Sequence, residues 1–207
     1  MLQAVDNRTV REINARIRAG RITTGDVAPA GMSLHDGLTA GVGDRIVTRR
    51  NHRRLTTADG FVRNGALWEG TAVLSDGPLR IRPASDADAA TVRLPADYVA
   101  EHVELGYATT IARTQGMTVD ETHTIASPCM GREDLYVAMS RGRHTNRTYV
   151  VHDHGDPECM PGHAPSSGRE ILERVLATSH AEPSATETWD PYHPGRAAPL
   201  VPPGRPQ

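Results

Sequence analysis

The chain has 207 residues, which is enough for one ordinary domain or for two small ones that share a core. Its 23 basic and 25 acidic side chains give a formal net charge of -2, which excludes a generally basic surface for nucleic acid and restricts any such site to a local patch. All of the basic residues are arginine, and this excludes a Walker A phosphate loop and a Schiff-base enzyme within the chain, because both need a lysine.

The composition changes after residue 150. Residues 1–150 contain 19 Arg against 17 Asp and Glu, whereas residues 151–207 contain 4 Arg against 8 and many prolines. Two cysteines are too few for a disulfide framework or a four-thiolate zinc site. The sequence shows no signal peptide pattern and no apolar run of membrane-spanning length, so we expect a cytoplasmic protein without a membrane partner.

The first predicted element is a helix of about ten residues. Val10, Ile13 and Ile17 stand at helical spacing within residues 9–19. Gly20 follows as the expected stop signal.

A group of short strands is predicted next. Runs of β-branched or alternating residues stand at 45–51, 67–74, 78–82 and 90–94. Asp-Gly and Asn-Gly pairs, which favour tight turns, stand at 59–60, 64–65 and 76–77. Four short strands joined by such turns predict a small antiparallel barrel over residues 43–95.

The elements after the barrel are of mixed type. Residues 95–102 fit a helix or a linker, and residues 109–116 are compatible with a helix. Residues 120–125 and 148–152 are strand-like, and a short helix is predicted over 132–139 between them. Strands that alternate with helices on both sides of an embedded barrel predict an interrupted α/β domain.

The carboxy-terminal residues are rich in Pro, Gly and His. Residues 169–177 fit a last helix, and the proline-rich end from Glu182 is expected to be disordered. By residue type alone, zinc ligands are present at His152, His154, Cys159 and His163. Their spacing matches no closed zinc pattern, so we expect solvated loop residues and no metal site.

Two segments carry the most specific pattern in the chain. Segment V is Gly106-Tyr-Ala-Thr-Thr-Ile-Ala-Arg-Thr-Gln-Gly-Met-Thr-Val-Asp120, and segment VI, about twenty residues later, is Leu135-Tyr-Val-Ala-Met-Ser-Arg-Gly-Arg143. In content, order and spacing they resemble motifs V and VI of superfamily 1 DNA helicases of the RecD-like class. The resemblance is greatest to the motor segment of TraA-type (MobF-like) conjugative relaxase-helicases.

The resemblance extends over about residues 1–152 and implies a fold. Residues 1–14 resemble the strand and helix around motif IV, and residues 43–51 with 61–70 look like the SH3-like insertion between motifs IV and V. The implied fold is α/β: a RecA-like second helicase lobe of the UvrD-like C-terminal type, interrupted by a small SH3-like β-barrel, with a disordered C-terminal tail.

The same resemblance divides the chain into four parts. Residues 1–42 would form the first part of the RecA-like lobe, and residues 43–95 the SH3-like barrel. Residues 96–152 would form the remainder of the lobe with motifs V and VI. Residues 153–207 would be a linker, a short helix and the disordered tail.

In segment VI, Arg141 matches the arginine finger of motif VI. An ATPase that works between two RecA-like lobes needs a cation from the second lobe near the γ-phosphate, and such an arginine increases the rate by roughly 10³ to 10⁵. Arg143 matches a nucleotide-sensing helper. The alternative for both residues is a solvated surface arginine or one paired with a carboxylate.

In segment V, small hydroxylated residues and a Gln-Gly turn let the chain approach a phosphate backbone and sense the nucleotide cleft. The resemblance implies a catalytic role for Gln115, nucleotide sensing by Gly116, and DNA contacts by Thr110 and Thr118. For Thr110, a hydroxyl satisfied in the interior is the alternative. This sequence departs from the motif at Ala112, where the family has His.

The predicted barrel carries a local arginine cluster. Six arginines stand against Asp44 and Asp59 within residues 44–63: Arg45, Arg49, Arg50, Arg53, Arg54 and Arg63. Such a patch suits single-stranded DNA, and we expect DNA contacts from Arg49, Arg50, Arg53, Arg54 and Arg63. Phe61 or Trp68 would offer a stacking face, although aromatic residues of a small barrel usually lie in its core. A solvated arginine face is the other alternative.

The functional expectation is a motor fragment that is incomplete by itself. ATP and Mg²⁺ would be held only by a missing nucleotide-binding lobe, supplied in cis or in trans, because the chain has no Walker A lysine and no Walker B strand ending in Asp-Glu. The alternative is a non-enzymatic or degenerate module that binds single-stranded DNA. Both alternatives have single-stranded DNA as a partner.

Overall fold

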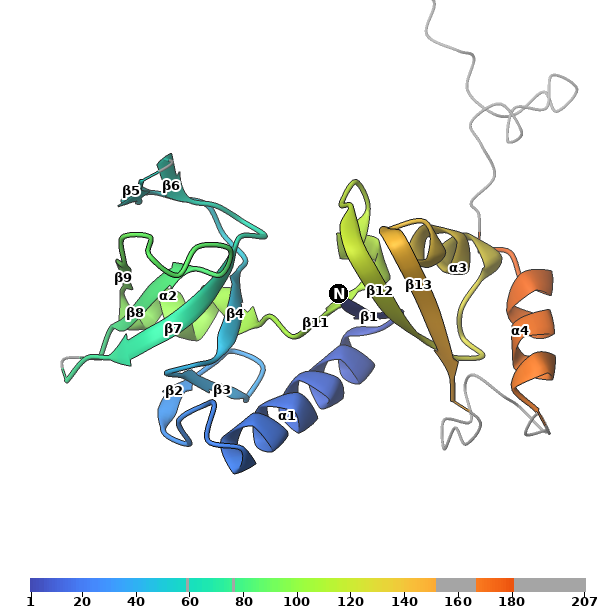
Figure 1. The fold of residues 1–207 in the computed structure, drawn as a ribbon, viewed down its shortest axis with the longest axis horizontal. Helices are drawn as coiled ribbons and strands as arrows, with labels where there is room; N and C mark the ends of the chain where they lie inside the picture. Colours follow the sequence, from blue (N-terminus) through green and yellow to red (C-terminus); the bar gives the residue numbers. More distant parts are fainter. Residues whose placement is uncertain (59, 76, 152–166, 181–207) are drawn as a thin grey trace, which may run out of the picture.

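The structure is a computed structural model, and it describes residues 1–58, 60–75, 77–151 and 167–180. Two parts lie next to each other (Figure 1). One part is a parallel sheet with helices, and the other is an antiparallel sheet with two hairpins. The expected mixed α/β architecture with embedded antiparallel strands is therefore confirmed.

The parallel sheet has four strands in the order β11-β1-β12-β13. They are β1 (Leu2–Ala4), β11 (Ala108–Thr110), β12 (Val119–Ala126) and β13 (Gly142–Val150). Each strand is parallel to its neighbours. Helix α1 (Asn7–Thr23) packs on one face, and helices α3 (Arg132–Met139) and α4 (Gly168–Ala177) pack together on the other.

Two adjacent residues of β12 contribute to the apolar layers on these two faces. Ile125 packs against the buried cluster that includes Val10 of α1, whereas Ala126 belongs to the buried cluster that includes Ala138 of α3 and Ile171 of α4. Successive side chains of a strand point to opposite faces, so the sheet has an apolar layer on each side.

Helix α1 is longer than the sequence predicted. Asp6 caps its start, because the Asp6 carboxylate accepts a hydrogen bond from the Thr9 backbone N–H at 2.7 Å. The expected stop at Gly20 is wrong, and the helix continues to Thr23. The left-handed residue that follows the helix is Gly25, with φ of 80°, so this glycine has the role that the sequence assigned to Gly20.

The antiparallel sheet has five strands in the order β10-β4-β7-β8-β9. These strands are β4 (Arg45–Thr48), β7 (Leu67–Val73), β8 (Leu79–Pro83), β9 (Val92–Leu94) and β10 (Val103–Leu105). The two hairpins are β2 (Gly31–Ser33) with β3 (Thr39–Gly41), and β5 (His52–Thr57) with β6 (Gly60–Val62). The antiparallel part thus extends from β2 to β10, past both ends of the range 43–95.

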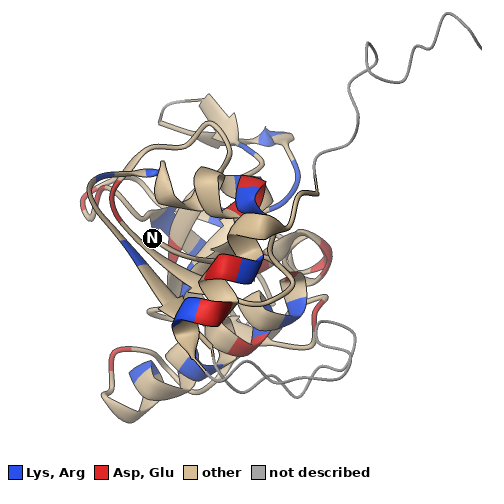
Figure 2. Cartoon of the chain, turned by 90° about the vertical axis from the view of Figure 1, so that its right-hand side faces the viewer, with Lys and Arg blue, Asp and Glu red and all other residues tan. Residues whose placement is uncertain are grey.

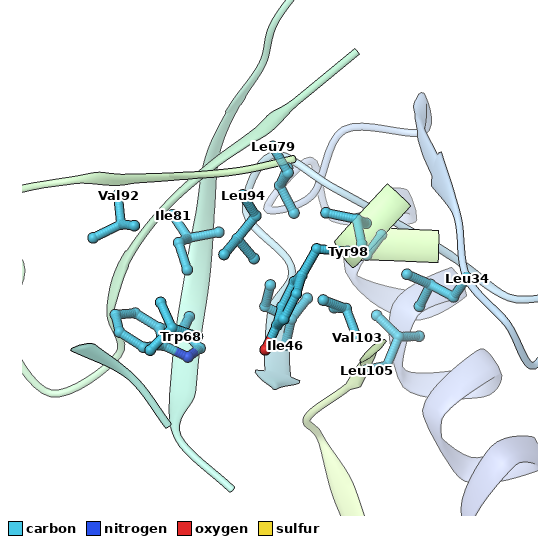
Figure 3. Packing of buried hydrophobic residues seen from close by; sticks show 13 residues of the cluster. Leu34, Ile46, Trp68, Leu79, Ile81, Val92, Leu94, Tyr98, Val103 and Leu105 are labelled. Carbon is cyan, nitrogen blue, oxygen red and sulfur yellow. The ribbon is translucent and has the colours of Figure 1, made fainter. Parts of the chain in front are cut away.

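The core of this part lies between the antiparallel sheet and α2 (Ala96–His102) (Figure 3). Trp68 is only 4% exposed and lies in the core beside Ile81, and its indole N–H donates to the Thr48 hydroxyl at 3.1 Å. Trp68 is therefore a core residue and offers no stacking face. Tyr98, from α2, lies within the same core, near Leu94 and Val103.

Three other segments differ from or refine the sequence prediction. Residues 95–102 form α2, and the helix-compatible residues 109–116 form the end of β11 and a short 3₁₀ helix, η1 (Ile111–Thr114). Strand β13 begins at Gly142, earlier than predicted. Helix α3 has the predicted bounds, whereas the expected disorder beyond residue 180 lies outside the described residues. None of the helices in the described ranges is long and apolar enough to cross a membrane.

Candidate functional site

Segments V and VI meet at one edge of the parallel sheet. The turn at residues 115–118 leads into β12, and the end of segment VI leads into β13. Because the two strands are parallel, both leading turns lie at the same edge, along the upper side of Figure 1. The Val119 backbone N–H donates to the Arg141 carbonyl at 3.0 Å and joins the two segments directly.

Arg141 lies at the centre of this junction. Its Nε donates to the Val137 carbonyl at 2.9 Å, its Nη2 to the Ser140 hydroxyl at 2.8 Å, and its Nη1 to the Met117 carbonyl at 3.4 Å. These three acceptors are uncharged, and the side chain is partly exposed. These hydrogen bonds hold the guanidinium in place at the sheet edge, and none of the three acceptors is a carboxylate.

The other candidate residues of the two segments differ in exposure. Gln115, Gly116 and Thr118 are exposed in the turn, where Gly116 has φ of 81°. Arg143 is exposed at the start of β13. Thr110 is 6% exposed, so it lies in the interior next to η1 rather than in the turn. The structure thus brings four of these five residues to one edge of the sheet.

Gln3 of β1 connects the two segments from within the parallel sheet, and the sequence pattern did not identify this residue. Its side chain is fully buried, and its amide donates to the Ala138 carbonyl and to the Thr124 hydroxyl, both at 2.9 Å. Its amide oxygen accepts from the Thr114 hydroxyl at 3.1 Å. The sequence signal that could have identified Gln3 is its polar amide, which stands between the apolar residues Leu2 and Ala4 of a short strand.

Tyr107 connects segment V to the antiparallel part. Its hydroxyl donates to the buried Asp44 carboxylate at 2.8 Å, and Asp44 also receives the Arg18 guanidinium at 2.9 Å. Burial, together with the adjacent Asp44 carboxylate, raises the pKa of Tyr107 to about 12. This linkage joins α1, the residue before β4 and segment V, and the sequence did not reveal it.

Arginines of the predicted cluster gather on the β5–β6 hairpin. The guanidinium carbons of Arg53 and Arg63 lie 5.8 and 5.4 Å from the centroid of the Phe61 ring. Arg54 is exposed on the same hairpin. The arrangement presents two cations around one partly exposed aromatic ring, which is the chemistry that phosphate and base recognition needs.

Arg50 and Arg49 lie at the base of the hairpin. Nη1 of Arg50 lies 3.0 Å from Nε2 of His102, at an open groove of about 440 Å³ between residues 50–54 and α2. Arg49 differs from the other arginines, because it is largely buried and pairs with Glu104 at 2.7 Å. The cluster therefore divides into exposed hairpin arginines and one arginine that is already neutralised.

The opposite end of the molecule has a different charge pattern. On the side of α3 and α4, Figure 2 shows basic and acidic residues next to one another along the helices. Among the residues that the structure describes, no group of three or more His, Cys, Asp or Glu side chains is placed to hold a metal ion. Residues His152, His154, Cys159 and His163 lie outside the described residues.

Sequence similarity to two known proteins shows the family of the chain. No family model matches it. Two Mycobacterium tuberculosis proteins, uncharacterized protein Rv2311 of strain ATCC 25618 / H37Rv and uncharacterized protein MT2373 of strain CDC 1551 / Oshkosh, are each 35% identical to it over 124 residues. The match covers 60% of this chain and 70% of each relative. The chain belongs to the Rv2311 family.

The fold of this Rv2311-family chain is similar to that of Pif1 helicases. The crystal structure of Bacteroides Pif1 bound to single-stranded DNA matches with a TM-score of 0.52 and 19% identity over 84% of this chain. The same helicase with ADP-AlF₃ and single-stranded DNA matches with a TM-score of 0.50 and 20% identity. The chain spans 45% and 44% of these two solved chains. The expected likeness to RecD-like superfamily 1 helicases is thereby confirmed for the fold.

A partial sequence match points to conjugation proteins. The conjugal transfer protein TraA of Rhizobium radiobacter is 29% identical over 107 residues. This match covers 52% of the present chain and 9% of TraA. The chain is therefore similar to a small part of that protein.

Proposed function

We propose that this chain is the C-terminal motor fragment of an ATP-dependent DNA helicase of the conjugative relaxase type. In this function it supplies the motif V contacts to single-stranded DNA and the motif VI arginine finger. The nucleotide-binding lobe, in cis or in trans, holds ATP and Mg²⁺. The observation that carries the proposal is the junction of segments V and VI around Arg141, whose guanidinium lies at one sheet edge and bonds to two carbonyls and a hydroxyl.

Arg141 supplies the arginine finger in this function. Among the residues that the structure describes, its guanidinium bonds to uncharged oxygens at the junction. A phosphate oxygen is a stronger acceptor than a carbonyl or a hydroxyl, so a γ-phosphate at this edge competes well for the guanidinium. Arg143 and Gly116 sense the nucleotide from the same edge, and Gln115 takes part in catalysis.

The single-stranded DNA path follows the same side of the molecule. The β5–β6 hairpin and the turn before β12 both lie along the upper side of Figure 1. Arg53, Arg54 and Arg63 bind phosphates on the hairpin, with Arg50 at its base. Thr118 contacts the backbone at the turn, whereas Thr110 supports the strand from the interior. The Pif1 structures solved with single-stranded DNA support this assignment.

The experiment that tests the motor function is ATP hydrolysis by a mixture. The purified chain alone is expected to hydrolyse no ATP, because no lysine is present to hold the phosphates. Addition of a matching nucleotide-binding lobe and single-stranded DNA is expected to produce hydrolysis. Arg141→Ala is expected to lower this rate by about 10³-fold or more, as for other arginine fingers.

The matched control is Arg147→Ala. Arg147 is an exposed arginine of β13, the strand that follows segment VI, and it lies outside the junction. Its removal is expected to leave the rate within about twofold, since an exposed arginine away from the cleft has little effect. Equal rates for Arg141→Ala and the unmodified chain, at equal thermal stability, would refute the arginine-finger role.

A second function is favoured by two observations: Ala112 stands where motif V of the resembled helicases has His, and two arginines lie close to the Phe61 ring. In this function the chain is a non-enzymatic single-stranded DNA-binding module. The triple change Arg53, Arg54 and Arg63 to Ala is expected to reduce the slope of log affinity against log salt by about 2, since each phosphate that an arginine neutralises on a single strand adds about 0.7 to that slope. Fluorescence anisotropy with labelled DNA measures this slope.

The control for this titration removes three exposed arginines elsewhere. Arg8, Arg132 and Arg169 are exposed helical residues, with 79%, 57% and 86% of their side chains accessible. Their joint change to Ala alters the net charge equally and is expected to change the slope much less. Equal slopes for the two triple variants would show that the hairpin is not the DNA site.

A further inference from the structure

One carboxylate gathers cations from both parts of the molecule. Glu104 of β10 accepts Nε and Nη2 of Arg49, both at 2.7 Å from its Oε2. The same oxygen accepts Nη1 of Arg113 at 2.9 Å. Nε2 of His35 lies 3.6 Å from the other carboxylate oxygen. Two guanidinium groups and an imidazole thus converge on one anion.

The two arginines have different origins. Arg49 follows β4 in the antiparallel part, and its backbone N–H donates to the His102 carbonyl at 2.7 Å. Arg113 lies in η1, in segment V of the other part. The Glu104 side chain is 16% exposed, whereas the Arg113 side chain is 38% exposed. An anion from solvent can therefore approach the cluster from the Arg113 side.

We propose that Arg49 and Arg113 form a phosphate-binding site for single-stranded DNA, and that Glu104 closes this site from within. The proposal rests on the DNA-binding function proposed above. The Glu104 carboxylate and a DNA phosphodiester present the same chemistry to the two arginines. Each carries one negative charge on oxygens that accept hydrogen bonds from guanidinium groups. The DNA backbone must displace Glu104 before it contacts these arginines.

Burial of the cluster affects the competition between Glu104 and a DNA phosphate for the two arginines. Burial lowers the pKa of Arg49, and the hydrogen bond and charge of Glu104 oppose that effect. Loss of Glu104 leaves two neighbouring cations without their common anion, and a phosphate then restores the charge balance. DNA engagement at this site also releases the bridge that Glu104 makes between β4 and segment V.

The test is single-stranded DNA binding by Glu104→Gln in the full chain. The amide keeps the shape of the side chain but removes its charge, so both arginines become available to phosphate. We expect about tenfold tighter binding at low salt and a slope of log affinity against log salt that is steeper by about 0.7 to 1.4, for one to two additional phosphate contacts. Unchanged or weaker binding overturns the proposal.

The matched control is Glu69→Gln. Glu69 also pairs with an arginine of the antiparallel part, Arg82, at 3.0 Å, and its removal changes the net charge by the same amount. We expect no comparable gain from this variant. An equal gain would reduce the effect of Glu104→Gln to a general charge effect and would overturn the proposal.

Arg113 provides the second arm of the test. When Arg113→Ala is added to Glu104→Gln, most of the gain in affinity is expected to disappear, and its persistence contradicts the proposed site. If Glu104→Gln does not fold, as judged by circular dichroism, Glu104→Asp replaces it. The shorter side chain keeps the charge but does not reach both arginines, so a smaller gain is expected, and no gain overturns the proposal.

Failure of the underlying DNA function gives a different result. If neither the unmodified chain nor any variant binds single-stranded DNA, the proposed function fails together with this site. If the unmodified chain binds DNA and Glu104→Gln gains nothing, only the Glu104-closed site fails.

Discussion

At the scale of single residues, buried polar side chains hold the candidate site together. Gln3 has no exposed surface, and all of its described hydrogen bonds go to segment V, β12 or α3. A buried amide that satisfies several partners fixes their relative positions, because removal of any one hydrogen bond leaves a desolvated group without a partner. Gln3 therefore helps to fix the positions of segments V and VI relative to each other.

We predict that Gln3→Met lowers the free energy of unfolding by about 2 kcal/mol or more, because the Thr124 hydroxyl and the Ala138 carbonyl lose the buried amide that donates to them. Gln115→Met, at an exposed position of the adjacent turn, is expected to change it by less than about 0.5 kcal/mol. Urea unfolding followed by circular dichroism measures both values. Equal stabilities of the two variants would contradict the role of Gln3.

The sequence predicts residue types at the site better than their pairing. The motif pattern placed Arg141, Gln115 and Gly116, and the structure brings them to one edge because β12 and β13 are parallel. Arg49 looked equivalent to its neighbours in the arginine cluster. Its partner Glu104 is 55 residues away and becomes adjacent only when β10 pairs with β4, so sequence spacing does not reveal the pair.

At the scale of elements, helix α4 is attached to the rest of the molecule at its end. Ile171 and Val175 are fully buried against the α3 side of the sheet. The residues after α4 bond to Glu133 of α3: the His180 backbone N–H at 3.1 Å and the Ser179 hydroxyl at 2.8 Å. These bonds, led by the His180 N–H, lower the pKa of Glu133 from 4.5 to about 2.

This lowered pKa predicts an acid-sensitive contact. A carboxyl whose pKa is lower in the folded than in the unfolded state stabilises the fold above pH 4.5, and the stabilisation is lost as the pH falls from 4.5 through 2. We therefore compare the unfolding free energy of the unmodified chain with that of Glu133→Gln. The difference between the two is expected to decrease as the pH falls over this range. Urea unfolding at several pH values measures this difference.

The control for the pH series is Glu173→Gln, since Glu173 lies on α4 and pairs with Arg169 of the same helix at 2.8 Å. This exposed pair is expected to contribute little at any pH. A difference for Glu133→Gln that stays constant from about pH 6 to pH 2 would contradict the contact.

Element boundaries show where the sequence was insufficient. The periodic helices and the turn-bounded strands were predictable, because apolar spacing and Asn-Gly or Asp-Gly pairs act locally. The end of α1 was not, since Gly20 is tolerated inside the helix and Gly25 supplies the left-handed turn. The strand β11 was also missed, because its parallel pairing with β1, about 105 residues earlier in the chain, overrides local helix propensity.

At the scale of the whole molecule, the antiparallel part is fixed to the parallel sheet by short polar links. The Asn14 side chain of α1 accepts from the Ala108 N–H at 2.8 Å and donates to the Leu105 carbonyl at 3.2 Å. Gly106 is needed in this connection, because a Cβ there would lie 2.9 Å from the Leu67 side chain and 3.0 Å from the Ile46 backbone. These links join α1 and the antiparallel sheet to the connection between β10 and β11.

The most direct measurement of the proposed DNA path is photo-crosslinking of the full chain to single-stranded DNA that contains 5-iodouracil. Mass spectrometry of the crosslinked peptides is expected to identify the β5–β6 hairpin around Phe61 and the turn at residues 115–118, the two elements along the same side of the molecule. Crosslinks confined to other surfaces, such as Tyr149 on β13, which is 47% exposed, would contradict the path and the helicase-like function built on it.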